Sequence, residues 1–247
     1  MSTVKPLVTV VIPAHNEERY IGRCIASVQR AQRVYGGDVE IIVVCNRCTD
    51  RTDEIARQCG AYVLYNEERC IAAVRNAGIA AARGKILLTI DADNRMTPGT
   101  IREVWLLLGS GKYIGGGAPM LFERSSLPLY LNDLLCRAGF AVTGLYCGIF
   151  WAKTASFREI GGFADIRAME DVETAKRLKA LGRQQGRGYT CLRDNCLINS
   201  TRKFDEQGDW LYFRMMVQNA GSFVKAALGD TRELDSMIDD LFYEYPR

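Results

Sequence analysis

Two carboxylates, one residue apart, follow a short apolar segment of the chain. Residues 86–90 have the composition of a buried strand of a parallel sheet, and Asp91-Ala92-Asp93 comes directly after them. In open α/β sheets, ligands bind at the carboxyl ends of the strands. Two carboxylates at that place repel each other and lose hydration unless a cation neutralises them. The pattern therefore favours a site where a hard divalent metal holds a diphosphate.

Two earlier segments also place polar side chains where predicted strands end. Residues 13–17 (Pro-Ala-His-Asn-Glu) follow a predicted strand, which we expect Pro13 to terminate. Residues 46–50 (Asn-Arg-Cys-Thr-Asp) follow the next predicted strand. Because parallel strands end at the same edge of a sheet, the three segments together predict a ligand crevice of the nucleotide-binding kind.

A second acidic segment, Glu170-Asp171, lies much later in the chain. Acids in the first turn of a helix are stabilised by the helix dipole by about 0.3–1 kcal/mol, and they need no function. The functional alternative is a general base near the metal site, able to take a proton from an acceptor hydroxyl.

Apolar spacing predicts the elements that position these segments. Predicted strands lie at residues 7–12, 39–44, 61–65, 86–90 and 113–121. Predicted helices begin near residues 21, 52, 70 and 99, and further helices are expected at 127–145 and 171–181. Alternation of strands and helices favours an α/β fold with a mostly parallel central sheet. We expect both halves of the chain to share that sheet.

Composition limits the classes of protein that fit. The chain has 247 residues, enough for one large α/β domain, and 48% of them are hydrophobic. A net charge of +3 is too small to indicate nucleic-acid binding. Nine cysteines without a repeating framework favour a reduced, cytoplasmic protein, and the predicted N-terminal strand argues against a signal peptide. The sequence predicts no transmembrane segment, and peripheral contact with the inner face of the membrane stays open.

In order and spacing, several segments resemble one known family. They are residues 10–17 (Val-Val-Ile-Pro-Ala-His-Asn-Glu), 41–44, 48–52, Arg75-Asn76-Ala77-Gly78, Asp91-Ala92-Asp93, Gly161-Gly162-Phe163 and Glu170-Asp171. Over about residues 7 to 205 the chain resembles family 2 glycosyltransferases of the GT-A fold. The resemblance implies an enzyme of the hexosyltransferase type. It would transfer a sugar from a nucleotide diphosphate with inversion and with Mn²⁺ or Mg²⁺ bound.

The resemblance also implies roles for individual residues. On the donor side, Pro13, Ala14 and Glu17 would line the nucleoside, and Asn46 would face the base. The strand-end segment would bind the donor, with Asp91 at the ribose, Ala92 between the carboxylates, and Asp93 at the metal beside Asp91.

The remaining roles concern the diphosphate and the acceptor. Arg75 would lie near the diphosphate or near the second acidic segment. Asp171 would be the catalytic base, and Glu170 would orient the acceptor. Arg202 and Lys203 follow residues 199–201 (Asn-Ser-Thr). They are either a solvated turn or a clamp over the diphosphate on a loop that orders when donor binds.

Departures from the family pattern leave the donor open. Cys45 and Cys48 replace the Asp and Ser that many members carry there. We expect a UDP-sugar first, and a GDP-sugar transferred to a polyprenyl phosphate as the alternative. Residues 207–210 (Gln-Gly-Asp-Trp) lack the Arg of the processive signature, which favours addition of a single sugar. A nucleotide-binding protein without transfer is a further alternative.

A different class of protein is suggested by Cys45-Asn46-Arg47-Cys48. A Cys-x-x-Cys between a strand and a helix resembles a thioredoxin-like redox site. That alternative explains none of the carboxylates.

The domain organisation that we expect is a single GT-A domain over residues 1–247. Its nucleotide-sugar-binding half would span about residues 7–110, and its acceptor and catalytic half about 111–205. A helical tail would follow at 206–247. Aromatic and aliphatic residues at 122–151 could meet a sugar, lipid-linked or small-molecule acceptor. The sequence predicts no oligomeric state.

Overall fold

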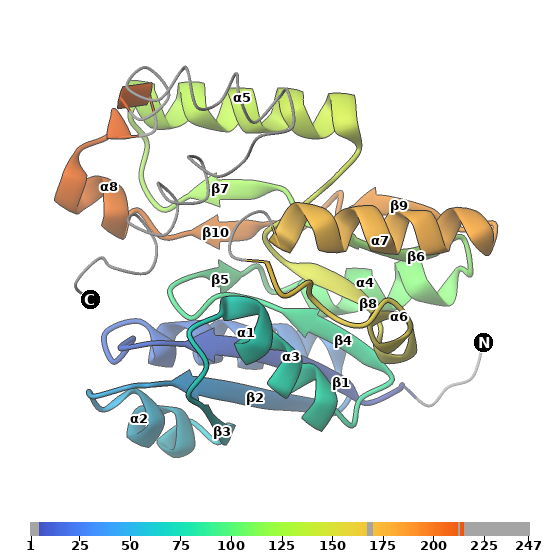
Figure 1. Ribbon diagram of the computed structural model, residues 1–247, viewed down its shortest axis with the longest axis horizontal. Coiled ribbons are helices and arrows are strands. Elements are labelled where there is room, and N and C mark those ends of the chain that lie inside the picture. Colours follow the sequence, from blue (N-terminus) through green and yellow to red (C-terminus); the bar gives the residue numbers. More distant parts are fainter. Residues whose placement is uncertain (1–4, 167–169, 212, 215–247) are drawn as a thin grey trace.

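The computed structural model describes residues 5–166, 170–211 and 213–214, and in these ranges a seven-stranded sheet forms the centre (Figure 1). Its strand order is β3-β2-β1-β4-β8-β6-β9. The strands are β1 (Val8–Ala14), β2 (Val39–Asn46), β3 (Tyr62–Asn66), β4 (Ile86–Thr89), β6 (Tyr113–Gly117), β8 (Phe150–Lys153) and β9 (Gly188–Cys191).

The first four strands form the parallel part of the sheet, as the sequence predicts. They are connected by α1 (Ile21–Tyr35), α2 (Thr52–Gln58) and α3 (Ile71–Ala81). β1 pairs with β2 on one side and with β4 on the other, so the strand order reverses at β1. The crevice beyond the carboxyl ends of β1 and β4 is therefore the place where ligands bind in sheets of this topology.

Strands from the second half of the chain complete the same sheet. β8 runs antiparallel to both β4 and β6, and β6 pairs in parallel with β9. The helices α4 (Thr100–Gly109), α6 (Thr154–Glu159) and α7 (Glu170–Gln184) pack against these strands. The expectation that both halves share one sheet is confirmed.

Helices cover both faces of the sheet, because the strands are apolar on both sides. Val10 and Ile12 of β1 pack in one cluster with residues of α1 and α4. Val11 points to the other face and packs with residues of α3, α6 and α7. This two-sided burial explains why β1 is a nearly continuous apolar run, without the alternation of a half-exposed strand.

A small second sheet carries the remainder of the described chain. Its strand order is β5 (Arg95–Met96), β10 (Leu197–Asn199) and β7 (Met120–Phe122). Figure 1 shows it beside the central sheet, with α5 (Leu127–Thr143) beyond it and α8 (Arg202–Gln207) at its end. Phe204 and Leu211 pack against Leu129 of α5 in a separate small core.

Two strand predictions are wrong, and proline explains both. The single strand predicted at 113–121 is two strands in different sheets: β6 ends at Gly117, and β7 begins directly after Pro119, which has no N–H to donate. Pro13 does not end the first strand, which continues to Ala14. The β4 pairing of β1 stops at Val11, so Pro13 has a strand neighbour on the β2 side alone.

The tail predicted at 206–247 lies largely outside the described residues, which end at Arg214. Within the described ranges, none of the helices has the length and apolar character needed to cross a membrane.

Candidate active site

A buried arginine joins the two acidic segments. Arg75 of α3 donates to Asp91 Oδ1 at 2.9 Å, to Glu170 Oε1 at 2.9 Å and to Asp171 Oδ1 at 3.0 Å. The Arg75 side chain is 7% exposed. One guanidinium therefore holds the carboxylate at the end of β4 against the acids that begin α7. The structure places Arg75 beside the second acidic segment, one of the two positions implied by the family resemblance.

The buried position of Asp171 in this cluster raises the pKa of its carboxyl group. Burial raises the pKa of Asp171 from 3.8 to about 7, against the lowering effect of Arg75, and the nearby charges of Glu170 and Asp91 raise it further. The same three carboxylates raise the pKa of Arg75, although burial opposes the increase. An acid with a pKa near neutrality has the property that a general base needs at physiological pH.

A loop from the second half of the chain fixes the position of Arg75. The Arg75 guanidinium lies 5.0 Å from the centroid of the Phe163 ring. The neighbouring Asn76 donates to the Phe163 carbonyl at 2.9 Å and accepts from the Phe163 N–H at 2.8 Å. Gly162 has φ +70°, and a Cβ there would lie 2.3 Å from Asn76 Oδ1. Residues 161–163 (Gly-Gly-Phe) and residues 75–76 (Arg-Asn) therefore contact each other directly.

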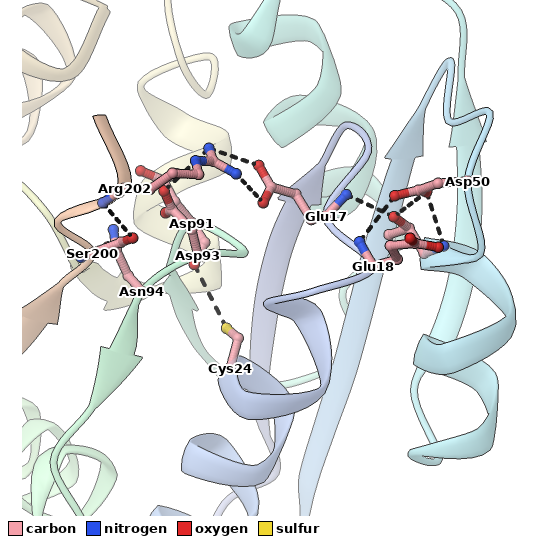
Figure 2. A network of polar contacts seen from close by, with 10 residues as sticks. Glu17, Glu18, Cys24, Asp50, Asp91, Asp93, Asn94, Ser200 and Arg202 are labelled. Carbon is pink, nitrogen blue, oxygen red and sulfur yellow. Dashed lines mark hydrogen bonds and ion pairs between the residues drawn. The ribbon is translucent and has the colours of Figure 1, made fainter. Parts of the chain in front are cut away.

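A second ion pair, shown in Figure 2, involves Asp93 of the same loop. Arg202 donates to Glu17 Oε2 at 2.8 Å and to Glu17 Oε1 at 3.3 Å, and its Nη2 lies 3.4 Å from Asp93 Oδ2. Its guanidinium also lies 5.0 Å from the centroid of the Tyr20 ring. Of the two readings of Arg202, the structure excludes the solvated turn, because the side chain is 15% exposed.

A side-chain contact holds the segment before Arg202 against the loop after β4. Asn94 Oδ1 accepts from the Ser200 N–H at 3.0 Å, a contact that Figure 2 also shows. At the far side, Arg124 pairs with Asp205 at 2.7 Å and with Asp209. The small sheet and α8 thus bring Arg202 to the carboxyl edge of the central sheet.

The segments after β1 and β2 form the third part of the site. Asn46 donates to the carbonyls of Asn66 and Glu68 at 2.7 and 2.8 Å, and its own carbonyl lies 2.6 Å from His15 Nδ1. Asp50 accepts from the backbone N–H of Glu18 at 3.0 Å, which ties the two segments together. The side-chain amide of Asn46 therefore shapes this loop.

Three small residues named from the resemblance have little exposed surface. Pro13, Ala14 and Ala92 are buried, so their side chains pack inside the protein.

The Cys-x-x-Cys segment is arranged differently from the thioredoxin-like alternative. Cys45 is fully buried within β2, and Cys48 donates to the Ala14 carbonyl at 3.4 Å. A hydrogen bond from the Cys45 thiol lowers the pKa of Cys48 and raises the pKa of Cys45. α2 begins at Thr52, beyond Cys48, so neither cysteine lies in its first turn.

The structure brings most of the predicted polar residues to one edge of the sheet, in two groups. Arg75, Asp91, Glu170 and Asp171 form one group, and Glu17, Asp93 and Arg202 form the other. Sequence reasoning gave no role to Tyr20 or Asn94. Phe163 and Asn76 stood within segments of the family pattern, which was the available signal for them.

The possible metal ligands at this edge of the sheet are carboxylate oxygens. Among the described residues, no group of three or more His, Cys, Asp or Glu side chains could hold a metal ion. Asp91 and Asp93 are hard oxygen donors, with side chains 44% and 20% exposed. Mg²⁺ is usually held by one or two carboxylates together with substrate phosphates. The residues therefore fit a cation shared with a diphosphate, and a cage made of protein ligands alone is not present in the described part of the chain.

Curated proteins that resemble this chain in sequence are glycosyltransferases by name. Glycosyltransferase AglE of Haloferax volcanii is 33% identical over 127 residues, which are 49% of this chain and 40% of that protein. The probable glycosyltransferase YdaM of Bacillus subtilis is 27% identical over 206 residues, which are 72% of this chain and 47% of that protein. The chain spans between about a quarter and a half of the length of the curated relatives it matches.

Two solved structures show the fold. S. aureus TarS in complex with UDP-GlcNAc is 17% identical with a TM-score of 0.61, covering 78% of this chain and 58% of TarS. The mannosyltransferase PcManGT from Pyrobaculum calidifontis, in complex with GDP-Man and Mn²⁺, is 21% identical with a TM-score of 0.62. That match covers 80% of this chain and 57% of the mannosyltransferase. The chain has the GT-A fold, and this overturns the thioredoxin-like alternative.

The family model of glycosyl transferase family 2 matches residues 9–134, just over half of the 247 residues. That range contains β1 except Val8, the Asp91–Asp93 loop and Arg75, and therefore much of the site. This protein belongs to glycosyl transferase family 2.

Proposed function

We propose that this protein is a metal-dependent, inverting glycosyltransferase that moves a single sugar from a nucleotide diphosphate to a hydroxyl acceptor. The observation that carries the proposal is the pairing of Arg75 with Asp91 and with Asp171. It puts a carboxylate of the donor loop and a candidate base on two sides of one buried cation. Inverting transfer needs this separation, because the acceptor attacks the face opposite the leaving diphosphate.

Asp171 would be the catalytic base. It would take the proton from the acceptor hydroxyl as the oxygen bonds to the anomeric carbon and the bond to the diphosphate breaks. Its pKa of about 7 supports this role, because an unperturbed carboxylate would be a much weaker base. Glu170, held by the same guanidinium, would orient the acceptor. A positioned base is typically worth about 10²–10⁴ in rate.

The donor diphosphate would lie at the carboxyl edge between β1 and β4. Asp93, with Asp91 beside it, would hold Mn²⁺ or Mg²⁺ there. When bound, such an ion supplies Lewis-acid stabilisation of the charge on the departing diphosphate. Glu17 and Asn46 line the nucleoside side of the same edge, and Arg202 would bind the diphosphate as a bidentate partner.

A UDP-sugar remains our first choice of donor. Among structures with the same fold, TarS binds UDP-GlcNAc, and PcManGT binds GDP-Man with Mn²⁺. Both bases therefore occur on this fold, and a GDP-sugar transferred to a polyprenyl phosphate remains the second candidate. The acceptor surface would include α5, where Leu127, Tyr130 and Leu134 are exposed.

Calorimetry with UDP and GDP, each with and without Mn²⁺, tests the donor site. We expect UDP binding that needs Mn²⁺ and that is lost in Asp93→Ala. Preferential binding of GDP would favour the second candidate, a GDP-sugar transferred to a polyprenyl phosphate. Failure of both nucleotides to bind at millimolar concentration would refute the proposal.

A further inference from the structure

Arg202 occupies the position of a cation at the candidate metal site. Its guanidinium contacts both oxygens of Glu17 and lies 3.4 Å from Asp93 Oδ2, the carboxylate proposed to hold the metal. Figure 2 shows Arg202 lying between these acids. The guanidinium also lies 5.0 Å from the centroid of the Tyr20 ring. The Glu17 side chain is 5% exposed. Burial of that carboxylate requires a compensating cation, and Arg202 supplies it.

A divalent ion at Asp93 would therefore meet a positive charge that is already in place. Two cations sharing one carboxylate repel each other, and this repulsion lowers the affinity of the site for a free metal ion. A diphosphate changes the balance, because it brings negative charge and acceptor oxygens for both cations. Arginine forms bidentate pairs with phosphate, and Mg²⁺ or Mn²⁺ binds phosphate oxygens as well.

We propose that Arg202 is a resident countercharge that keeps metal affinity low in the ligand-free protein and makes metal and nucleotide bind together. The inference rests on the proposed metal–nucleotide site. When nucleotide arrives, Arg202 shifts part of its contact from Asp93 to phosphate, and Asp93 becomes available to the metal. Since binding free energies are reciprocal, the nucleotide raises metal affinity by the factor by which the metal raises nucleotide affinity.

The anchoring of α8 gives a matched control for this inference. Arg202 is the first residue of α8, and the same helix is tied to the segment between β7 and α5 through the pair of Arg124 with Asp205 at 2.7 Å. Arg124→Gln would loosen α8 without touching Asp93. Arg202→Gln would remove the countercharge and keep a polar side chain of similar shape.

The experiment measures Mn²⁺ binding by the electron paramagnetic resonance signal of free Mn²⁺, with no nucleotide present. We expect Arg202→Gln to bind Mn²⁺ about tenfold more tightly than wild type, within the usual range of coupling between sites. Arg124→Gln should match wild type. Arg202→Gln combined with Asp93→Asn should lose the gain. Addition of UDP or GDP should tighten Mn²⁺ binding by about tenfold in wild type and by less in Arg202→Gln.

Distinct results separate this inference from the proposed function. If ligand-free Arg202→Gln binds Mn²⁺ no more tightly than wild type, while wild type binds Mn²⁺ with nucleotide, the countercharge inference is overturned and the donor site stands. If wild type binds no Mn²⁺ even with UDP or GDP, the donor site itself is overturned. Circular dichroism of each variant confirms that it is folded before binding is measured. A gain in Arg124→Gln equal to that in Arg202→Gln would assign the effect to looseness of α8 and overturn the inference.

Discussion

The Arg75 guanidinium and the Asp171 carboxylate meet at 3.0 Å although 96 residues separate them in the chain. The contact joins α3, in the half that binds the nucleotide in sheets of this kind, to the start of α7. It fixes the candidate base relative to Asp91, which the same guanidinium contacts at 2.9 Å. The position of Asp171 is therefore set by its contact with buried Arg75, and not by its own helix alone.

Replacement of the candidate base should separate binding from catalysis. We expect Asp171→Asn to keep nucleotide binding, because Asp91 and Asp93 remain, and to lower kcat by about 10²–10⁴. The measurement pairs calorimetry with a transfer assay. Glu173→Gln is the control, because Glu173 lies in the same first turn of α7 but pairs weakly, at 4.0 Å, with Lys176 and Arg177. Transfer by Asp171→Asn at the wild-type rate would remove Asp171 from the mechanism.

The raised pKa of Asp171 should appear in both activity and stability. The folded protein holds this proton up to about pH 7, whereas an Asp of ordinary pKa 3.8 releases it earlier. Activity should rise with pH through about 7 as the base ionises. The free energy of unfolding should change in the opposite direction. The contribution of Asp171 is fully present below pH 3.8 and is lost as pH rises through about 7.

Urea unfolding across this pH window, for wild type and Asp171→Asn, tests the assignment. The variant should lack the part of the pH dependence due to this residue. If the free energy of unfolding depends on pH in the same way in both proteins, the raised pKa does not belong to Asp171.

Removal of the Arg75 guanidinium should lower the free energy of unfolding more than removal of a surface ion pair does. Arg75→Met leaves Asp91, Glu170 and Asp171 without their common partner. Breaking one side of a buried pair costs about 3–5 kcal/mol, and we expect the lower end because Asp91 is 44% exposed. Arg137→Gln breaks an exposed pair with Asp133 and should cost about 0.3–0.5 kcal/mol. Urea unfolding measures both, and equal costs would show that the Arg75 cluster contributes no more than a surface pair.

Alanine substitutions at two adjacent glycines distinguish the effect of backbone strain from the effect of a steric clash. Gly162→Ala adds a Cβ 2.3 Å from Asn76 Oδ1 at φ +70°. Gly161→Ala has a similar φ of +77°, but its nearest neighbour is a side-chain nitrogen of Arg177 at 4.0 Å. Both variants carry the strain of a left-handed residue, about 1–3 kcal/mol.

We expect Gly162→Ala alone to disrupt the Asn76–Phe163 contact and lower activity as well. Thermal unfolding and a transfer assay of the two variants test this. Equal activity in both would show that the contact does not position Arg75.

The local residue pattern predicted most strands of the sheet. It did not predict where the first strand ends or where the chain passes from one sheet to the other. β2 and β4 were found within two residues of their ends, since an apolar run marks a buried strand wherever it lies. Pro13 was misread because its effect depends on which strand lies beside it. The segment at 113–121 was misread because the chain passes from one sheet to another at Pro119, a change that leaves the apolar pattern unbroken.

By itself, the sequence determined that polar side chains follow the strands at one edge of an α/β sheet, because strand periodicity and strand ends are local properties. Tertiary structure decided which charges meet. Arg75 contacts acids 95 and 96 residues away, and Arg202 contacts Glu17 across 185 residues. Such pairs depend on strand order and on the path of the crossovers. These bring together distant segments whose local sequences do not indicate that they will be in contact.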